Sequence, residues 1–198
     1  MYKSILLLVF LKAICILSFS QLKFGIKTGL NLATIIKIPY SAGYNRTAYF
    51  NAGLITRLDL SKRFYFSPQL LYSEKGYSEI MIPTGTSKLH LNYISMPLYF
   101  GYKLTKEILI QAGPEISYLL SGKFKDSRYT DDVTDIYNRV EFGISYGLNI
   151  KLTKHLFSEL MINNGITNLL PSFGTTFPAS GRNNVLQINF GYTFEHCN

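Results

Sequence analysis

Apolar and polar residues alternate along most of the chain after residue 20. In residues 140–151, one set of alternate positions is Val140, Phe142, Ile144, Tyr146, Leu148 and Ile150. The other set is Glu141, Gly143, Ser145, Gly147, Asn149 and Lys151. A period of two predicts a β-strand whose two faces meet different surroundings. The same alternation recurs in residues 22–32, 48–60, 64–75, 93–103, 108–118, 156–162 and 186–194.

The connections between these eight segments alternate in length. Residues 61–63, 105–107 and 153–155 form short turns. The other connections are longer and rich in Gly, Pro, Ser, Asn and Asp, at residues 33–47, 77–88, 121–138 and 168–182. This pattern is typical of outer-membrane barrels. We therefore predict an all-β fold, an eight-stranded antiparallel up-and-down transmembrane β-barrel with short periplasmic turns and longer extracellular loops.

The composition of the two faces favours lipid over water outside the barrel. The polar face carries many small residues, namely Gly25, Gly29, Gly53, Gly113, Gly143, Ser145, Gly147 and Gly191, which suit a narrow interior. The apolar face carries Phe, Ile and Leu, with tyrosines expected in the interfacial girdle at Tyr72, Tyr102, Tyr118, Tyr146 and Tyr192. The alternative is a soluble lipocalin-like barrel or sandwich, whose outer polar face would be richer in Lys, Glu and Thr.

If the polar face lines the lumen, the lumen holds charges of both signs. They are Lys27, Arg57, Asp59, Lys75, Glu115, Glu141, Lys151 and Glu159. An unpaired charge in a narrow interior is costly, so we expect Lys27 and Arg57 to pair with some of Glu115, Glu141 and Glu159. The network is interpreted as a structural plug, and the alternative is a proton or ligand site.

The first twenty residues have the features of a secretory signal peptide. A short basic start with Lys3 precedes an apolar stretch over 5–17, and the small residues Ser18 and Ser20 precede a cut before Gln21. A transmembrane anchor would need about 20 apolar residues, more than this stretch provides. The sequence before Cys15 is a poor lipobox. We therefore expect residues 1–20 to be removed and residues 21–198 to form one outer-membrane β-barrel domain.

Composition excludes several other classes of protein. The chain has 198 residues, of which 47% are hydrophobic and 16% charged, so it is not a disordered sequence. Two cysteines do not make a disulfide scaffold, and removal of the signal would leave Cys197 alone. Loss of Lys3 and Lys12 would lower the net charge from +8 to +6. Part of that excess lies in the short turns.

Five segments resemble a known family of outer-membrane proteins. They are Phe24–Leu32 (FGIKTGLNL), Pro68–Gly76 (PQLLYSEKG), Leu91–Leu98 (LNYISMPL), Ala112–Pro114 (AGP) and the closing segment Asn184–Phe194. These motifs, in this order, resemble the PorT-like outer membrane β-barrel family. The resemblance implies an eight-stranded barrel in a Gram-negative outer membrane, and one named member of the family is required for protein secretion across that membrane. Gln69 and Ser95 stand where the family pattern has Glu.

Catalytic and metal-binding motifs are absent from the sequence. There is no HExxH, phosphate-binding GxxxxGK[ST], CxxC pair or G-x-S-x-G segment. His90, His155 and His196 are expected at different ends of the barrel, and Ser158 and Glu159 on opposite faces of one strand. The loop 123–139 has balanced charge without the ligand spacing of a calcium site. We expect no catalytic residues, no metal and no cofactor.

The sequence therefore predicts a membrane protein that works by contact. We expect a non-enzymatic structural or interaction protein with a side-chain-filled lumen. Its partners would be outer-membrane lipids or lipopolysaccharide, and a protein that contacts the long loops. Nucleic acid is not expected, because the aromatic face is the lipid face. An accessory role in an outer-membrane secretion machine and a lipid-modifying enzyme are the alternatives.

Overall fold

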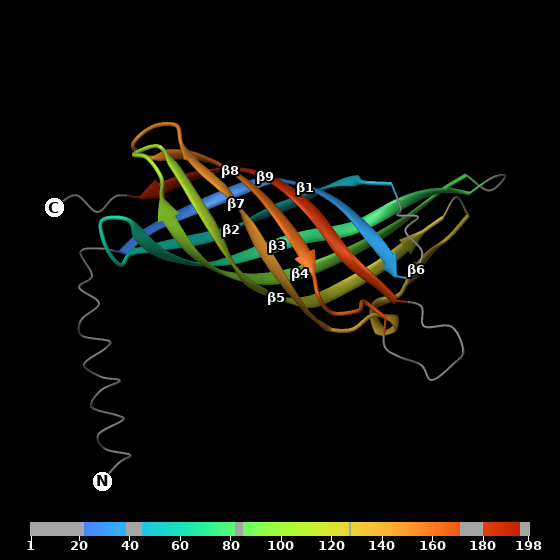
Figure 1. Ribbon diagram of the computed structural model, residues 1–198. Coiled ribbons are helices and arrows are strands. Elements are labelled where there is room, and N and C mark those ends of the chain that lie inside the picture. Colours follow the sequence, from blue (N-terminus) through green and yellow to red (C-terminus); the bar gives the residue numbers. More distant parts are fainter. Residues whose placement is uncertain (1–21, 39–44, 82–84, 127, 171–179, 195–198) are drawn as a thin grey trace, which may run out of the picture.

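A closed ring of antiparallel strands forms the body of the protein (Figure 1). The computed structural model describes residues 22–38, 45–81, 85–126, 128–170 and 180–194. The elements are β1 (Leu22–Ile38), β2 (Thr47–Asp59), β3 (Phe64–Met81), β4 (Gly85–Lys103), β5 (Ile108–Lys125), β6 (Thr130–Asp132), the 3₁₀ helix η2 (Thr134–Ile136), β7 (Val140–Lys151), β8 (Leu156–Gly165) and β9 (Ser180–Phe194). Strand β1 pairs with both β2 and β9, which closes the ring. The eight long strands confirm the predicted up-and-down barrel, and the short β6 pairs with the end of β5.

The strands are longer than the alternation predicted, and they replace much of the expected loops. The pairing of β3 with β4 continues to Met81↔Gly85, so the predicted loop 77–88 is a hairpin instead. Strand β5 likewise runs into the predicted loop 121–138. Above the apolar belt the contrast between the faces is reversed: inward side chains such as Leu89 and Phe124 are apolar, and outward ones such as His90 and Lys123 are polar. The alternation that marks lipid-facing strands therefore stops there, although the backbone pairing continues. In Figure 1 the ends of β3 and β4 and the ends of β5 and β6 both project at this end.

The three short turns share one design and lie at the opposite end, which we call the turn end. Each has a Leu, then Ser or Thr, then Lys, in residues 60–63, 104–107 and 152–155. In each, one hydroxyl accepts two backbone N–H groups: Ser61 from Arg63 and Phe64, Thr105 from Glu107 and Ile108, Thr153 from His155 and Leu156. Such side-chain caps are characteristic of Ser and Thr in turns. Strand β1 begins and β9 ends at this same end (Figure 1).

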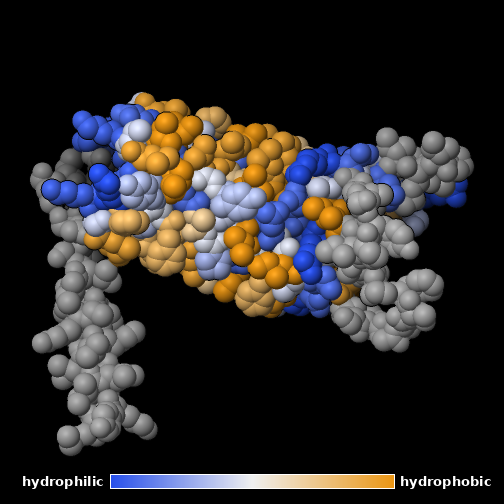
Figure 2. Space-filling model, viewed as in Figure 1, coloured by the Kyte–Doolittle hydropathy of each residue, from blue (hydrophilic) through white to orange (hydrophobic). Residues whose placement is uncertain are grey.

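The polarity of the two faces is the reverse of that in a water-soluble protein. Large apolar side chains point outward and are exposed, for example Phe24, Leu54, Phe100, Ile144 and Phe190. Figure 2 shows them as an apolar belt with hydrophilic residues at both of its edges. Of the expected tyrosine girdle, Tyr102 and Tyr192 lie near the turn end, but Tyr146 lies midway along β7.

Two inward-facing aromatic rings lie on glycines of a neighbouring strand. A Cβ at Gly101 would lie 2.0 Å from Tyr65 Cζ, and one at Gly191 would lie 2.1 Å from Phe157 Cζ. Tyr65 and Phe157 stand opposite these glycines in the strand register. The glycines therefore make room for aromatic side chains that fill the interior.

Inside the other end, which we call the loop end, the barrel is filled by an apolar cluster. Its buried members are Ile35, Leu89, Leu91, Tyr93, Leu119 and Leu169. The Tyr49 hydroxyl donates to the Leu89 carbonyl at 2.6 Å beside this cluster. The interior is therefore polar in its middle and apolar towards the loop end.

The proposed signal segment and its boundary lie outside the described residues, as do Cys197 and most of the connection between β8 and β9. Within the described ranges, we find no helix with the length and hydropathy needed to cross a membrane.

Candidate functional site: the polar lumen

The middle of the lumen is organised around one buried ion pair. Lys27 on β1 pairs with Glu159 on β8, and both side chains are almost completely buried. Gln111 donates to the other oxygen of Glu159 at 2.6 Å, and Asn189 donates to Glu159 at 3.2 Å. The Tyr65 hydroxyl donates to Gln111 at 3.0 Å. The carboxylate thus has a counter-charge and two amide donors, which is what a buried charge requires.

A second group lies closer to the loop end and centres on Lys75 of β3. Its ammonium group lies 3.2 Å from Glu115 on β5 and 3.6 Å from Glu141 on β7. It also lies 5.0 Å from the centre of the Tyr93 ring. Ser145 donates to Glu115 at 2.8 Å and Asn183 donates to Glu141 at 2.9 Å. One lysine therefore holds two carboxylates, each supported by a polar neighbour.

Arg57 is the charge that differs from the pairing we predicted. It faces the lumen and is buried, but no ion pair joins it to Glu115, Glu141 or Glu159, all of which the structure describes. Its guanidinium lies 5.0 Å from the centre of the Tyr65 ring. The reason lies in position along the axis: Arg57 is near the turn end, opposite Lys23 in the register. Glu159 is already bound to Lys27 deeper in the barrel.

The two remaining predicted charges lie at the turn end and are partly exposed. Asp59 pairs with Lys103 at 2.7 Å, a partner that the sequence did not suggest. Lys151 ends β7 and stands opposite Phe157. Neither belongs to the fully buried network.

The lumen holds equal numbers of buried cations and carboxylates, but the two kinds lie at different positions along the barrel axis. Among the described residues, three buried cations (Lys27, Arg57, Lys75) face three buried carboxylates (Glu115, Glu141, Glu159). The group around Lys75 has one cation and two carboxylates, whereas Arg57 near the turn end has none. The lumen is therefore more negative towards the loop end and more positive towards the turn end.

Several buried side chains in this network were not singled out from the sequence. They include Tyr65, Tyr99, Gln111, Asn163 and Asn183. The alternation carried a signal for some of them, because Tyr93, Tyr99 and Gln111 fall on the polar face. Their role as partners of charges depends on strands that are distant in sequence, and alternation along one strand contains no such information.

The arrangement fits a fixed scaffold better than a reaction centre. His90 lies 3.4 Å from Glu74, and His155 contacts the Thr193 carbonyl near the turn end. These histidines belong to opposite ends of the barrel. In the part of the chain that the structure describes, no three His, Cys, Asp or Glu side chains gather as a metal site would need.

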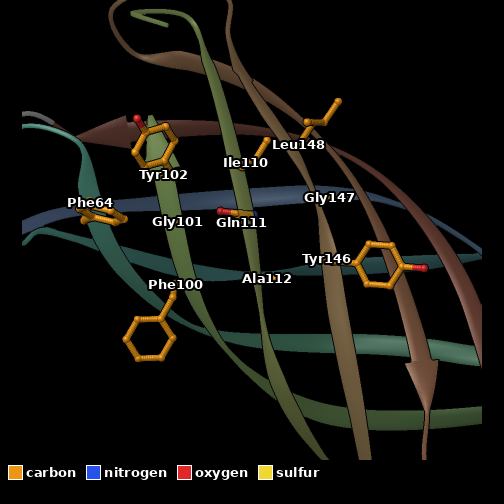
Figure 3. Close-up of a pocket in the computed structure, with 10 residues that line it drawn as sticks. All are labelled: Phe64, Phe100, Gly101, Tyr102, Ile110, Gln111, Ala112, Tyr146, Gly147 and Leu148. Carbon is orange, nitrogen blue, oxygen red and sulfur yellow. The ribbon is translucent and has the colours of Figure 1, made fainter. Parts of the chain in front are cut away.

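A shallow groove lies on the outer surface, where Ala112 of β5 stands between Phe100 of β4 and Tyr146 of β7. Figure 3 shows the side chains of Phe100 and Tyr146 directed away from the strands on either side of Ala112. The groove has a volume of about 520 Å³. Because it faces outward within the apolar belt, it suits an acyl chain of a lipid and is separate from the polar lumen.

A family model described as "Outer membrane protein beta-barrel domain" matches residues 18–170. The chain belongs to this family. Membership agrees with the closed ring and the outward apolar belt, and it places the protein in the outer membrane. The match supports the outer-membrane β-barrel family to which the sequence motifs pointed; the narrower PorT-like assignment stays an expectation.

Solved structures share the fold at low sequence identity. Ail, the attachment invasion locus protein of Yersinia pestis, has a TM-score of 0.52 and 11% identity, over 87% of this chain and 98% of Ail. Neisserial surface protein A has a TM-score of 0.57 and 10% identity, over 86% of this chain and 97% of that protein. Ail has also been solved in complex with the heparin analogue sucrose octasulfate. Comparison with curated proteins gives no match.

Proposed function

We propose that this small outer-membrane barrel is a non-enzymatic interaction protein with a closed lumen. The observation that carries the proposal is the filling of the interior. The Lys27–Glu159 pair and the Lys75 group occupy the middle, and the apolar cluster around Leu89 and Tyr93 occupies the loop end. An eight-stranded barrel has an interior just wide enough for side chains. The barrel then serves as a membrane anchor, and the residues at its two ends make the contacts with partners.

The loop end is the proposed contact surface for a protein partner. The β3–β4 hairpin projects there, and β6 and η2 fold back on β5. The backbone N–H of Val133 donates to the Gly122 carbonyl at 2.9 Å, and Gly122 N–H donates to Thr134 Oγ1 at 2.8 Å. This surface is therefore built on paired strands, which favours a defined shape for recognition.

A polar band between the apolar belt and the loop end suits lipopolysaccharide. Arg46 donates to Asn184 at 2.5 Å, and Asn184 donates to Asn164 at 2.5 Å. On another side of the barrel Glu74 lies 3.4 Å from His90. Outward polar side chains at this height would meet sugar and phosphate groups. We propose lipopolysaccharide as the lipid partner of the band.

Two measurements test the closed-lumen proposal. The full mature protein, folded into liposomes, is expected to give no more swelling in arabinose than empty liposomes, and no stable conductance steps in planar bilayers. A matched preparation of a large general porin provides the positive control. Solute entry or regular conductance steps from the folded protein would contradict a closed lumen.

The narrower alternative is an accessory role in outer-membrane protein secretion. The five PorT-like segments, from Phe24–Leu32 to Asn184–Phe194, support it. Deletion of the gene is then expected to reduce secreted proteins in the culture medium and to leave other outer-membrane proteins unchanged. A change in lipid A mass on deletion, with normal secretion, would instead favour a lipid-modifying enzyme.

We also propose that residues 1–20 are a signal peptide cleaved between Ser20 and Gln21. Mass spectrometry of protein purified from the outer membrane is expected to find Gln21 as the first residue. An intact N-terminus would contradict this proposal.

A further inference from the structure

The lumen opens at the turn end into a small cavity of about 170 Å³. It is lined by Lys23, Arg57, Lys151, Thr153, Lys154, His155, Leu156, Phe157 and Thr193. These residues come from β1, β2, β7, β8, β9 and the turn 152–155. The cavity therefore sits at the mouth of the barrel, on the side of the short turns, which is the periplasmic side in bacterial outer-membrane barrels.

The wall of this cavity is strongly basic. Four of its nine lining residues are Lys or Arg, and none of the nine is Asp or Glu. Lys151 is close enough to Lys23, Arg57 and Lys103 to be repelled by them, and Asp59 is the acid that opposes this repulsion. Asp59 is itself paired with Lys103 at 2.7 Å. Among the described residues, positive charge at this mouth thus exceeds negative charge.

Arg57 supplies a second, independent indication of a ligand. It is only 7% exposed, and its Nε is buried without a hydrogen-bond partner. The Tyr65 ring lies at one side of its guanidinium. A buried charged donor normally has a hydrogen-bond acceptor, and a buried donor without one indicates a position where a bound ion can supply the acceptor. An acceptor entering from the cavity would provide the missing partner.

We infer that this cavity binds a phosphate group through Arg57, Lys23 and Lys151. Inorganic phosphate or a phosphate monoester brings about −1.5 to −2 charges and three strong acceptor oxygens, which match several fixed cations better than a monocarboxylate does. The phosphodiester of a phospholipid headgroup brings a single charge, and its two free oxygens can be shared between Arg57 and a lysine. Thr153 adds a donor, because its oxygen accepts from the His155 and Leu156 N–H groups and its own hydrogen stays available. The phosphate comes either from the solution or from the headgroup of an anionic phospholipid.

The first experiment measures binding of inorganic phosphate to the full mature protein, folded in an uncharged detergent, by isothermal titration calorimetry at constant ionic strength. Lys151→Gln and Arg57→Gln are each expected to weaken binding at least tenfold. Lys106→Gln is the matched control, because Lys106 is an exposed lysine of another short turn and does not line the cavity. Equal affinity in all four proteins, or no binding to the unchanged protein, would overturn the inference.

The same set of variants is also tested for correct folding and for selectivity between phosphate and a carboxylate. A shift in gel migration between heated and unheated samples reports the folded barrel. If Arg57→Gln does not fold, the partly exposed Lys151 still provides the test. Acetate that binds as tightly as phosphate would overturn the assignment of a phosphate group.

Nanodiscs distinguish the two sources of phosphate. If the ligand is a lipid headgroup, discs of phosphatidylglycerol are expected to compete with inorganic phosphate and weaken its apparent affinity at least tenfold relative to the uncharged detergent. Unchanged affinity in the discs would identify phosphate from solution. Either result supports the phosphate site, provided that the Lys151→Gln variant shows the loss described above.

Discussion

Lys27 and Glu159 form an ion pair inside the barrel although 132 positions separate them in the chain. Strand β9 lies between their strands and contributes Asn189 to the same carboxylate. Both the first and the last long strands must therefore be in place before the pair is complete. The contact joins β1 to β8, the last strand but one, from within the lumen.

Removal of one member of this pair is expected to destabilise the barrel strongly. Lys27→Met leaves Glu159 buried without its counter-charge, and such a change typically costs about 3–5 kcal/mol. The measurement is urea unfolding of the protein in lipid vesicles. The double variant Lys27→Met/Glu159→Gln should recover much of the loss because no buried charge is left. Equal stability of Lys27→Met and the exposed control Lys106→Met would contradict this account.

The close contact of Tyr65 with Gly101 predicts a steric effect. Gly101→Ala places a methyl group 2.0 Å from Tyr65 Cζ, so the ring or the strand must move, at a cost of about 1–3 kcal/mol. Gly143→Ala is a matched control on the same face, because its Cβ would meet no atom closer than 3.0 Å. In a Tyr65→Ala background, Gly101→Ala should cost less. A cost that does not depend on Tyr65 would show that the strain arises elsewhere.

The repeated short turns predict similar and independent effects. Ser61→Ala, Thr105→Ala and Thr153→Ala each remove an oxygen that accepts two backbone N–H groups. Each should lower the free energy of unfolding by about 0.5–1.5 kcal/mol. The three losses should add because each hydroxyl bonds only groups of its own turn and the residue that follows it. Thr105→Ser keeps the oxygen and serves as the control. If Thr105→Ser is as destabilising as Thr105→Ala, the hydroxyl is not the cause.

Asp132 provides a prediction about pH at the loop end. Hydrogen bonds from Thr134, its side chain first and its backbone N–H at 2.9 Å second, lower the pKa of the Asp132 carboxyl below its ordinary value of 3.8. A lowered pKa means that the ionised form is favoured in the folded loop. Its stabilising contribution is complete above pH 3.8 and is lost as the pH falls through the lowered pKa.

Carbon-13 NMR of labelled Asp carboxyls checks this expectation. The midpoint for Asp132 should move upward in Thr134→Ala, which removes the hydroxyl. An unchanged midpoint in that variant would mean that the Thr134 hydroxyl does not lower the pKa of Asp132, because Ala keeps the backbone N–H.

The sequence was sufficient for the architecture because a barrel in lipid imposes a simple rule on each strand. Outward residues such as Phe142, Ile144 and Leu148 had to be apolar, and their alternation with Glu141 and Ser145 located the strand. Beyond the lipid this constraint no longer applies, so the sequence predicts a loop where β3 and β4 in fact pair as far as Met81 and Gly85. Pairing of backbone groups continues there, although the apolar side chains now face inward, as Leu89 does.

The partners of the lumen charges were harder to predict for a different reason. Alternation places Arg57 and Lys27 on the same face, but it does not give the height of Glu159, Glu115 and Glu141 relative to them. Height depends on the stagger between neighbouring strands. That stagger puts Lys75 between two carboxylates and leaves Arg57 beside Lys23 and Tyr65. The pattern gives no signal for Tyr65, because it lies between Phe64 and Phe66 in an aromatic run.

The strict alternation of the strands also has a consequence for the chain before it folds. Every second side chain of a strand such as β7 is small or polar. The strands therefore contain no continuous apolar segment long enough to be inserted into the inner membrane as a transmembrane helix during export. The apolar side chains occupy alternate positions, so they form a continuous lipid-facing surface only when neighbouring strands pair and place these side chains on the same face. One sequence can therefore pass through the inner membrane during export and still be retained in the outer membrane after it folds.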